Sequence, residues 1–275
     1  SALDSRAKRS GLALGVLFLG DVFVSTILAE IAQILPIIKP KAQPFHSIPI
    51  NDCGEPLVAL STMGDFAYET PAPYAAAGAP YNGISPFSLR SGVAKKLLQA
   101  QAKLHETHPK WRIKIFDAFR PVSVQAYMVA HSFYHIAKEL GLNPLAVDEA
   151  ERDSVLAKVY RIWSPPNQDP LTPPPHSTGA AIDCTLVDEH GVEIDMGSPI
   201  DFNGDESNPD YFKTSNLTAH QHRNLLRDAM QSQGFIQHAA EWWHYSYGDQ
   251  LWVWYKQKQG DAAHTHAIYG RSDKS

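Results

Sequence analysis

The chain is poor in cysteine and has no excess of basic residues. Two cysteines in 275 residues are too few for a disulfide framework. A single bridge between Cys53 and Cys184 stays open, although the composition favours two small apolar side chains in the core. The formal net charge is −5, and the scattered Lys and Arg form no basic patch. We therefore expect no nucleic-acid partner.

Long hydrophobic runs without charges are also missing. Residues 11–38 are mostly apolar and follow the basic segment Arg6–Arg9, but Asp21 and Glu30 interrupt them. A carboxylate in the middle of a bilayer costs about 2.5–3.5 kcal/mol. The segment fits either a leader or membrane anchor, or an amphipathic helix that packs on the body or on a neighbouring subunit. A periplasmic or membrane-attached protein follows from the first alternative and a cytoplasmic one from the second.

The remaining chain is long enough for one large domain with a substantial core, since 44% of all residues are hydrophobic. Lys39–Pro44 contains two prolines and reads as a linker. This predicts residues 1–45 as an N-terminal apolar leader, anchor or packing helix with its linker. Residues 46–275 are then the catalytic domain.

Apolar periodicity within this domain predicts helices in the first part and strands in the later part. The absence of regular strand–helix–strand alternation favours an α+β fold, a largely antiparallel central sheet with flanking helices. The predicted helices are 89–104, 123–140, 147–161 and 218–233, and the predicted strands are 111–116, 180–187, 192–196, 235–237, 243–247 and 251–255.

Two segments contain the residue types of a catalytic zinc site. In the first, His176 precedes Asp183 by seven positions, and both imidazole and carboxylate suit Zn²⁺. In the second, Glu241-Trp-Trp-His244 offers a third ligand, His244, and a nearby general base, Glu241. A regular strand would point Glu241 and His244 to opposite faces. We therefore expect a turn or bulge before a strand that starts near His244.

A third segment, Phe116-Asp-Ala-Phe-Arg-Pro121, places an arginine just after a predicted strand. The guanidinium of Arg120 is permanently charged and offers donors in a fixed plane, which suits an oxyanion or a carboxylate. An ion pair with Asp117 is the ordinary alternative.

Taken together, these segments resemble the zinc D-alanyl-D-alanine dipeptidases of peptidase family M15, whose fold is shared with D,D-peptidases and hedgehog signalling domains. The resemblance covers roughly residues 48–255 and includes a Met-Gly-Ser-x-x-Asp segment that ends at Asp201. It implies one zinc ion per chain, held by His176, Asp183 and His244. The activity it implies is hydrolysis of D-Ala-D-Ala, with a place in cell-wall metabolism.

The same resemblance assigns roles to further residues. Glu241 becomes the general base and Arg120 the stabiliser of the tetrahedral intermediate, while Asp201 receives the free amino group of the substrate. We also expect Trp242 and Trp243 to form walls of the substrate site. The sequence leaves the oligomeric state and the physiological role open, whether wall recycling, nutrition or resistance.

The chain departs from the family where Pro174 and Pro175 replace substrate-binding serines, which puts substrate breadth in doubt. The alternative function is a zinc D,D-carboxypeptidase or endopeptidase that acts on peptidoglycan stem peptides. A signalling domain with a zinc site but little activity is a further alternative. Trp242 and Asp201 favour the dipeptidase over the carboxypeptidase or endopeptidase. Glu241 and Arg120 favour an enzyme over the signalling domain.

Overall fold

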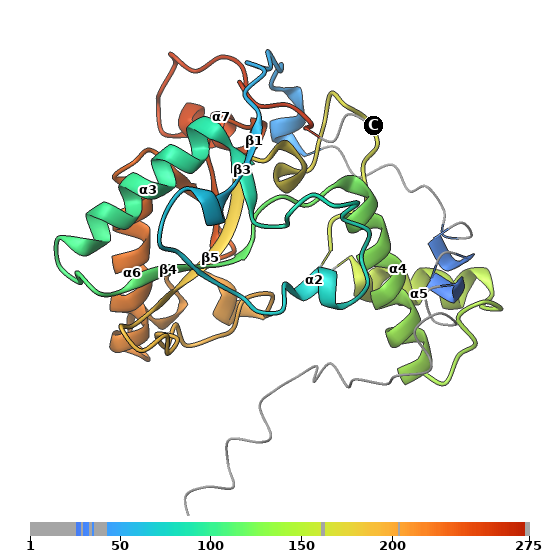
Figure 1. Ribbon diagram of the computed structural model, residues 1–275. Helices are drawn as coiled ribbons and strands as arrows, with labels where there is room; N and C mark the ends of the chain where they lie inside the picture. Colours follow the sequence, from blue (N-terminus) through green and yellow to red (C-terminus); the bar gives the residue numbers. More distant parts are fainter. Residues whose placement is uncertain are drawn as a thin grey trace, which may run out of the picture.

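The computed structural model shows a twisted sheet between helices (Figure 1). It describes residues 26–28, 30–32, 35, 43–160, 163–202 and 204–272. Much of the segment predicted as a leader, anchor or packing helix therefore lies outside the described residues. In the part that is described, no helix is long and apolar enough to cross a membrane.

The main sheet has five strands in the order β2-β4-β5-β7-β6. Only β2 and β4 run parallel, and the other neighbours are antiparallel, as the α+β prediction required. A second, antiparallel pair joins β1 to β3. The strands are β1 (Leu57–Ala59), β2 (Ala67–Tyr68), β3 (Ser88–Arg90), β4 (Arg112–Asp117), β5 (Ala181–Val187), β6 (Ile236–Gln237) and β7 (His244–Ser246).

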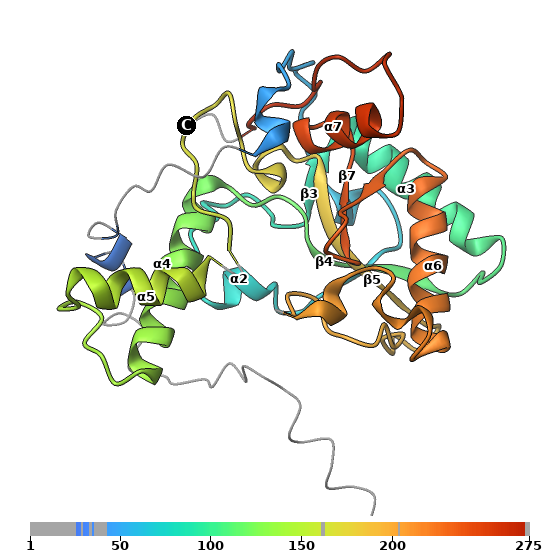
Figure 2. The ribbon, with the colours of Figure 1, turned by 180° about the vertical axis from the view of Figure 1, so that it is seen from behind.

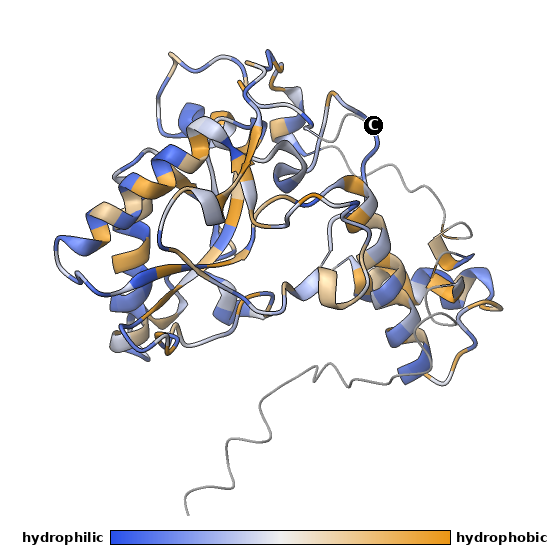
Figure 3. Cartoon of the chain, in the orientation of Figure 1, coloured by the Kyte–Doolittle hydropathy of each residue, from blue (hydrophilic) through white to orange (hydrophobic). Residues whose placement is uncertain are grey.

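One face of the sheet packs on α3 and α6, which lie side by side in Figures 1 and 2. Strand β5 turns Ile182, Cys184 and Leu186 toward this core, and Figure 3 shows orange, apolar segments in this part of the sheet. Its alternate residues point to the opposite face, because side chains alternate along a strand. In the part of the chain that the structure describes from residue 43 on, the helices of four or more residues are α2 (Pro73–Ala76), α3 (Ser91–His105), α4 (Val122–Glu139), α5 (Glu149–Val159), α6 (Leu217–Gln231), α7 (Gln250–Lys258) and the 3₁₀ helices η1 (Pro44–Ser47) and η3 (Pro175–Thr178).

A second apolar cluster lies beyond that opposite face, around α4 and α5 (Figure 2). Phe133 of α4 and Leu156 of α5 belong to it, together with Leu28 and Ile31 from the N-terminal region. Leu28 and Ile31 are 1% and 0% exposed, so this short helical stretch packs on the body.

Two predicted strands are wrong. Residues 251–255 lie in α7, because the carboxylate of Asp249 accepts a hydrogen bond from the Trp252 amide and caps a helix there. The apolar run had no periodicity that separates a buried strand from a buried helix. Residues 192–196 form only an isolated bridge, between Val187 and Glu193. Asn216 caps α6, two residues before the predicted helix start at residue 218.

The early segments also contribute more strand than expected, because β1 to β4 all precede residue 118. The two cysteines do not pair. Cys184 is buried, as the composition favoured, whereas Cys53 is exposed.

Candidate active site

The three predicted metal ligands come from the face of the sheet opposite α3 and α6. Asp183 on β5 lies directly across from His244 on β7 in the strand register. His176 lies on η3, just before β5, and Gly179 ends that short helix with a left-handed backbone (φ 70°) that glycine adopts readily. The local turn therefore brings His176 back over the strand that carries Asp183.

The ligand atoms of these residues all lie within 4.8 Å of one another, and all three residues are buried. His244 Nδ1 is 3.0 Å from Asp183 Oδ1, and His176 Nε2 is 3.3 Å from Asp183 Oδ2. The two ring nitrogens, His176 Nε2 and His244 Nδ1, are 3.2 Å apart. Two nitrogens and a carboxylate around one point form the donor set of a catalytic zinc site.

The outer nitrogens of both rings decide which tautomers are present. His176 Nδ1 lies 2.8 Å from the carbonyl oxygen of Ala118, which can only accept, so this nitrogen carries the proton. His244 Nε2 faces Ser246 Oγ at 3.3 Å, and that hydroxyl donates to Asp249 Oδ2 at 2.9 Å. Both inner nitrogens therefore present lone pairs toward the carboxylate. Three converging acceptors fit a bound cation, and the outer hydrogen bonds orient the ligands.

Electrostatics keep the Asp183 carboxylate ionised. Burial alone would raise its pKa, but in the absence of a metal a protonated imidazole of His176 or His244 outweighs burial and lowers the pKa below the ordinary value. The same contact raises the pKa of His244 against the opposing effect of its burial. A charged carboxylate is the form that binds a metal.

Asp117 extends the row to a third strand, because it pairs with Asp183 across β4 and β5. A register shift between Ile115 and Asp117 turns the aspartate away from the apolar face that Ile115 occupies. Its Oδ2 lies 3.4 Å from His176 Nδ1 and 2.8 Å from Arg120 Nη2. The sequence indicates Asp117 only as an ion-pair partner of Arg120, and the β-bulge that aims it into the site has no clear sequence signal.

Arg120 follows β4 directly and is held firmly in place. Besides Asp117, it donates through Nη1 to Gln125 Oε1 at 3.0 Å, and its Nη2 approaches Asp183 Oδ2 at 3.5 Å. The guanidinium also lies over the rings of Tyr74 and Trp163. The ion pair with Asp117, which was the ordinary alternative, is therefore present. Arg120 also faces the ligand cluster, where its proposed role toward an oxyanion would place it.

Glu241 lies in a turn, as expected from the spacing of Glu241 and His244. Trp242 and Trp243 form the turn, and β7 begins at His244. Glu241 Oε2 is 3.9 Å from His244 Nδ1, and its side chain is 41% exposed. The carboxylate therefore reaches the ligand cluster while remaining open to water. His238, which no sequence pattern indicated, has its Nδ1 at the same distance of 3.9 Å from this oxygen.

Asp201 is half-buried close to Arg120 but outside the ligand cluster. Its backbone has φ 60°, a left-handed conformation that is uncommon outside glycine but tolerated by aspartate. Oδ2 accepts a hydrogen bond of 3.0 Å from the hydroxyl of Tyr74. Burial, reinforced by the charge of Asp183 and opposed by Arg120, raises the pKa of Asp201 to about 7. A buried carboxyl in need of a positive partner suits the recognition of an ammonium group.

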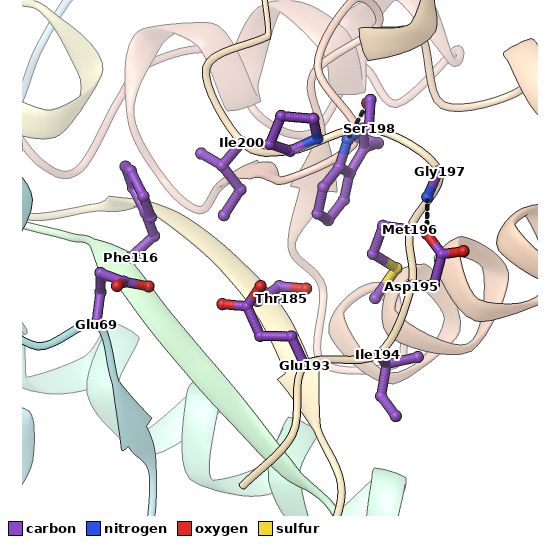
Figure 4. Close-up of a pocket in the computed structure, with 12 residues that line it drawn as sticks. Glu69, Phe116, Thr185, Glu193, Ile194, Asp195, Met196, Gly197, Ser198 and Ile200 are labelled. Carbon is purple, nitrogen blue, oxygen red and sulfur yellow. Dashed lines mark hydrogen bonds between the residues drawn. The ribbon is translucent and has the colours of Figure 1, made fainter. Parts of the chain in front are cut away.

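The two tryptophans are both buried, and both belong to the main core cluster. Trp242 donates from its indole to Ser198 Oγ at 3.1 Å and lines a cavity of about 540 Å³ between β5 and residues 193–200 (Figure 4). Thr185 lines this cavity and lies two positions from Asp183 on the same face of β5, whereas none of the three predicted ligands lines it. A role of either tryptophan as a substrate wall stays a prediction.

The two prolines before His176 shape its entry into the site. Pro175 is the first residue of η3, and the carbonyl of Pro174 accepts hydrogen bonds from the amide and hydroxyl of Ser177. These prolines hold the short helix that presents His176, and they bring no side-chain donor to a substrate.

Comparison with known proteins finds similarity over most of the chain. Residues 68–265 match the D-Ala-D-Ala dipeptidase family of peptidase M15. A D-alanyl-D-alanine dipeptidase of Synechocystis sp. is 44% identical over 240 residues, which is 83% of this chain and 96% of the relative. Proteins with the same name are 28% identical in Enterococcus faecalis (63% of this chain, 80% of the relative) and 41% identical over 70 residues in Escherichia coli (26% and 36%).

Proposed function

Because the chain belongs to the D-Ala-D-Ala dipeptidase family of peptidase M15, we propose that it hydrolyses the free dipeptide D-Ala-D-Ala to two D-alanines with one zinc ion per chain. The observation that carries this proposal is the convergence of His176 Nε2, Asp183 and His244 Nδ1. Both inner ring nitrogens present lone pairs there, because their outer nitrogens donate to other groups. These three residues would hold the zinc.

The chemistry that a bound zinc supplies is polarisation of the scissile carbonyl and acidification of the attacking water. Glu241 takes the proton of that water and later delivers it to the nitrogen of the leaving D-alanine. Its exposed side chain, 3.9 Å from His244 Nδ1, supports this role because the carboxylate reaches both the cluster and solvent.

Arg120 and Asp201 both act on the first D-alanine of the substrate. The guanidinium of Arg120, 3.5 Å from Asp183 Oδ2, donates to the oxyanion that develops from the carbonyl. Asp201 receives the ammonium group of the first D-alanine. A carboxylate buried beside the site gives a free amino group a strong preference over a blocked one.

The proposal is tested by hydrolysis of D-Ala-D-Ala and of N-acetyl-D-Ala-D-Ala by the purified chain, with metal analysis before and after chelation. We expect about one zinc per chain, rapid cleavage of the free dipeptide, slow cleavage of the acetylated one, and recovery of activity when zinc is returned. Efficient cleavage of the acetylated peptide would instead support the D,D-carboxypeptidase. A metal-loaded chain that cleaves neither peptide would reject a peptidase of this class.

A further inference from the structure

Tyr74 lies at the junction of the two substrate-facing charges. It belongs to the short helix α2, and its side chain is almost fully buried, with the residue 4% exposed. Its hydroxyl oxygen is 3.0 Å from Asp201 Oδ2 and 3.3 Å from Arg120 Nη2. No other described residue is recorded with hydrogen bonds to both of these side chains.

The direction of each hydrogen bond follows from the partners. Arginine has only donors, so Arg120 donates to the phenol oxygen and the phenol proton goes to Asp201. This arrangement uses one lone pair of Oδ2, and Oδ1 and the second lone pair of Oδ2 stay available to accept from an ammonium group. The ring is fixed as well, since it packs edge-on against Trp163 and Phe116 and lies beneath the guanidinium of Arg120.

We propose that Tyr74 is a positioning residue that makes the site selective for substrates with a free amino group one residue from the scissile bond. This inference rests on the proposed function, in which Asp201 receives the ammonium and Arg120 faces the scissile carbonyl. A single oxygen atom joins both groups, so the phenol sets the spacing between the amine-binding carboxylate and the oxyanion-binding guanidinium. In a dipeptide, one Cα atom separates the amino group from the scissile carbonyl, and a fixed spacing selects this length.

The test separates the hydroxyl from the ring. Tyr74→Phe keeps the aromatic packing and removes only the two hydrogen bonds. Tyr127→Phe is the matched control, because the hydroxyl of Tyr127 donates to the carbonyl of Ala77 and ties down the same loop away from the charges. For both variants, zinc content and melting temperature are measured alongside kcat and KM for D-Ala-D-Ala and for its N-acetyl form.

Tyr74→Phe is expected to raise KM for D-Ala-D-Ala about tenfold to a hundredfold, the range for a hydrogen bond to a charged group, with a much smaller change in kcat. The kcat/KM for the acetylated peptide should barely change. The ratio of kcat/KM for the free dipeptide to kcat/KM for the acetylated one therefore decreases. Zinc content should stay at the unmodified level, and Tyr127→Phe should leave both KM and the preference unchanged.

A double-mutant cycle with Asp201→Asn decides whether Tyr74 acts through Asp201. When Asp201→Asn is already present, Tyr74→Phe should raise KM by less than about threefold, because the ammonium has lost its partner. Fully additive effects, or a Tyr74→Phe variant that behaves like Tyr127→Phe, would overturn the inference while the dipeptidase activity stands. Failure of the unmodified chain to cleave D-Ala-D-Ala would overturn the proposed function and the inference together.

Discussion

The two halves of the candidate site are built in different ways. The ligand half is held by backbone pairing, since Asp117, Asp183 and His244 form one row across three neighbouring strands. The substrate half has no such row. Tyr74 on the short helix α2 and Asp201 in a turn are 127 residues apart in the chain and meet through a side-chain hydrogen bond.

This difference separates metal binding from specificity. Side chains directly opposite on paired strands have Cβ atoms about 4.5–5.5 Å apart, so the ladder itself sets the spacing of Asp183 and His244. Loops vary more readily than strands, and residues on them can change without disturbing the ladder. We therefore expect changes in the ligand half to affect zinc content, and changes in the substrate half to affect affinity at constant zinc.

The largest effect is expected from the ligand half. His244→Ala or His176→Ala should lose zinc and activity together, because two remaining ligands hold a catalytic metal poorly. Metal analysis of each purified variant, with activity measured in added zinc, checks this. Full zinc occupancy in both variants would show that these histidines are not ligands. Metal binding could then no longer be assigned to this half of the site.

Glu241 lies between the two halves and should show a smaller effect. Glu241→Ala should retain about one zinc per chain while kcat falls by about 10²–10⁴-fold, since a general base is lost without a ligand. The pair of measurements is zinc content and kcat on D-Ala-D-Ala. A near-normal kcat would assign proton transfer to another group, of which His238 is the nearest described candidate.

The smallest effect is expected on the stability of the fold and comes from Asp201 in the substrate half. Burial raises the pKa of Asp201 from the ordinary 3.8 to about 7, so the folded chain keeps this proton to a higher pH than the unfolded chain. Its stabilising contribution is therefore complete below about pH 4 and is lost as the pH rises to about 7. Without metal, the unmodified chain should lose stability relative to Asp201→Asn over this interval, on the order of a few kcal/mol.

Urea denaturation of both metal-free proteins at several pH values between about 4 and 8 measures this difference. Asn does not titrate, so the difference between the two curves isolates Asp201. Parallel stability curves would show that the carboxyl is solvated in the folded protein and would weaken its assignment as the ammonium partner.

Local patterns predicted most of the elements that build the site. The alternation in residues 111–116 and the apolar run in residues 180–187 correspond to β4 and β5, and the odd spacing of Glu241 and His244 predicted the turn before β7. The failure at residues 251–255 is instructive, because the capping residue Asp249 stands in the sequence and predicts a helix start. The strand prediction relied on the apolar run, although the capping residue Asp249 correctly indicated a helix.

What the sequence determined by itself is the chemistry: which residues can bind zinc, which can move a proton, and the short-range spacings that let His176 and Asp183 share a site. The tertiary structure alone decided that a β-bulge aims Asp117 at the ligands and that Tyr74 joins Asp201 to Arg120. The reason is physical. Side-chain identity and local periodicity are properties of neighbouring residues, whereas contacts between distant segments depend on strand register and on the packing of loops over the sheet.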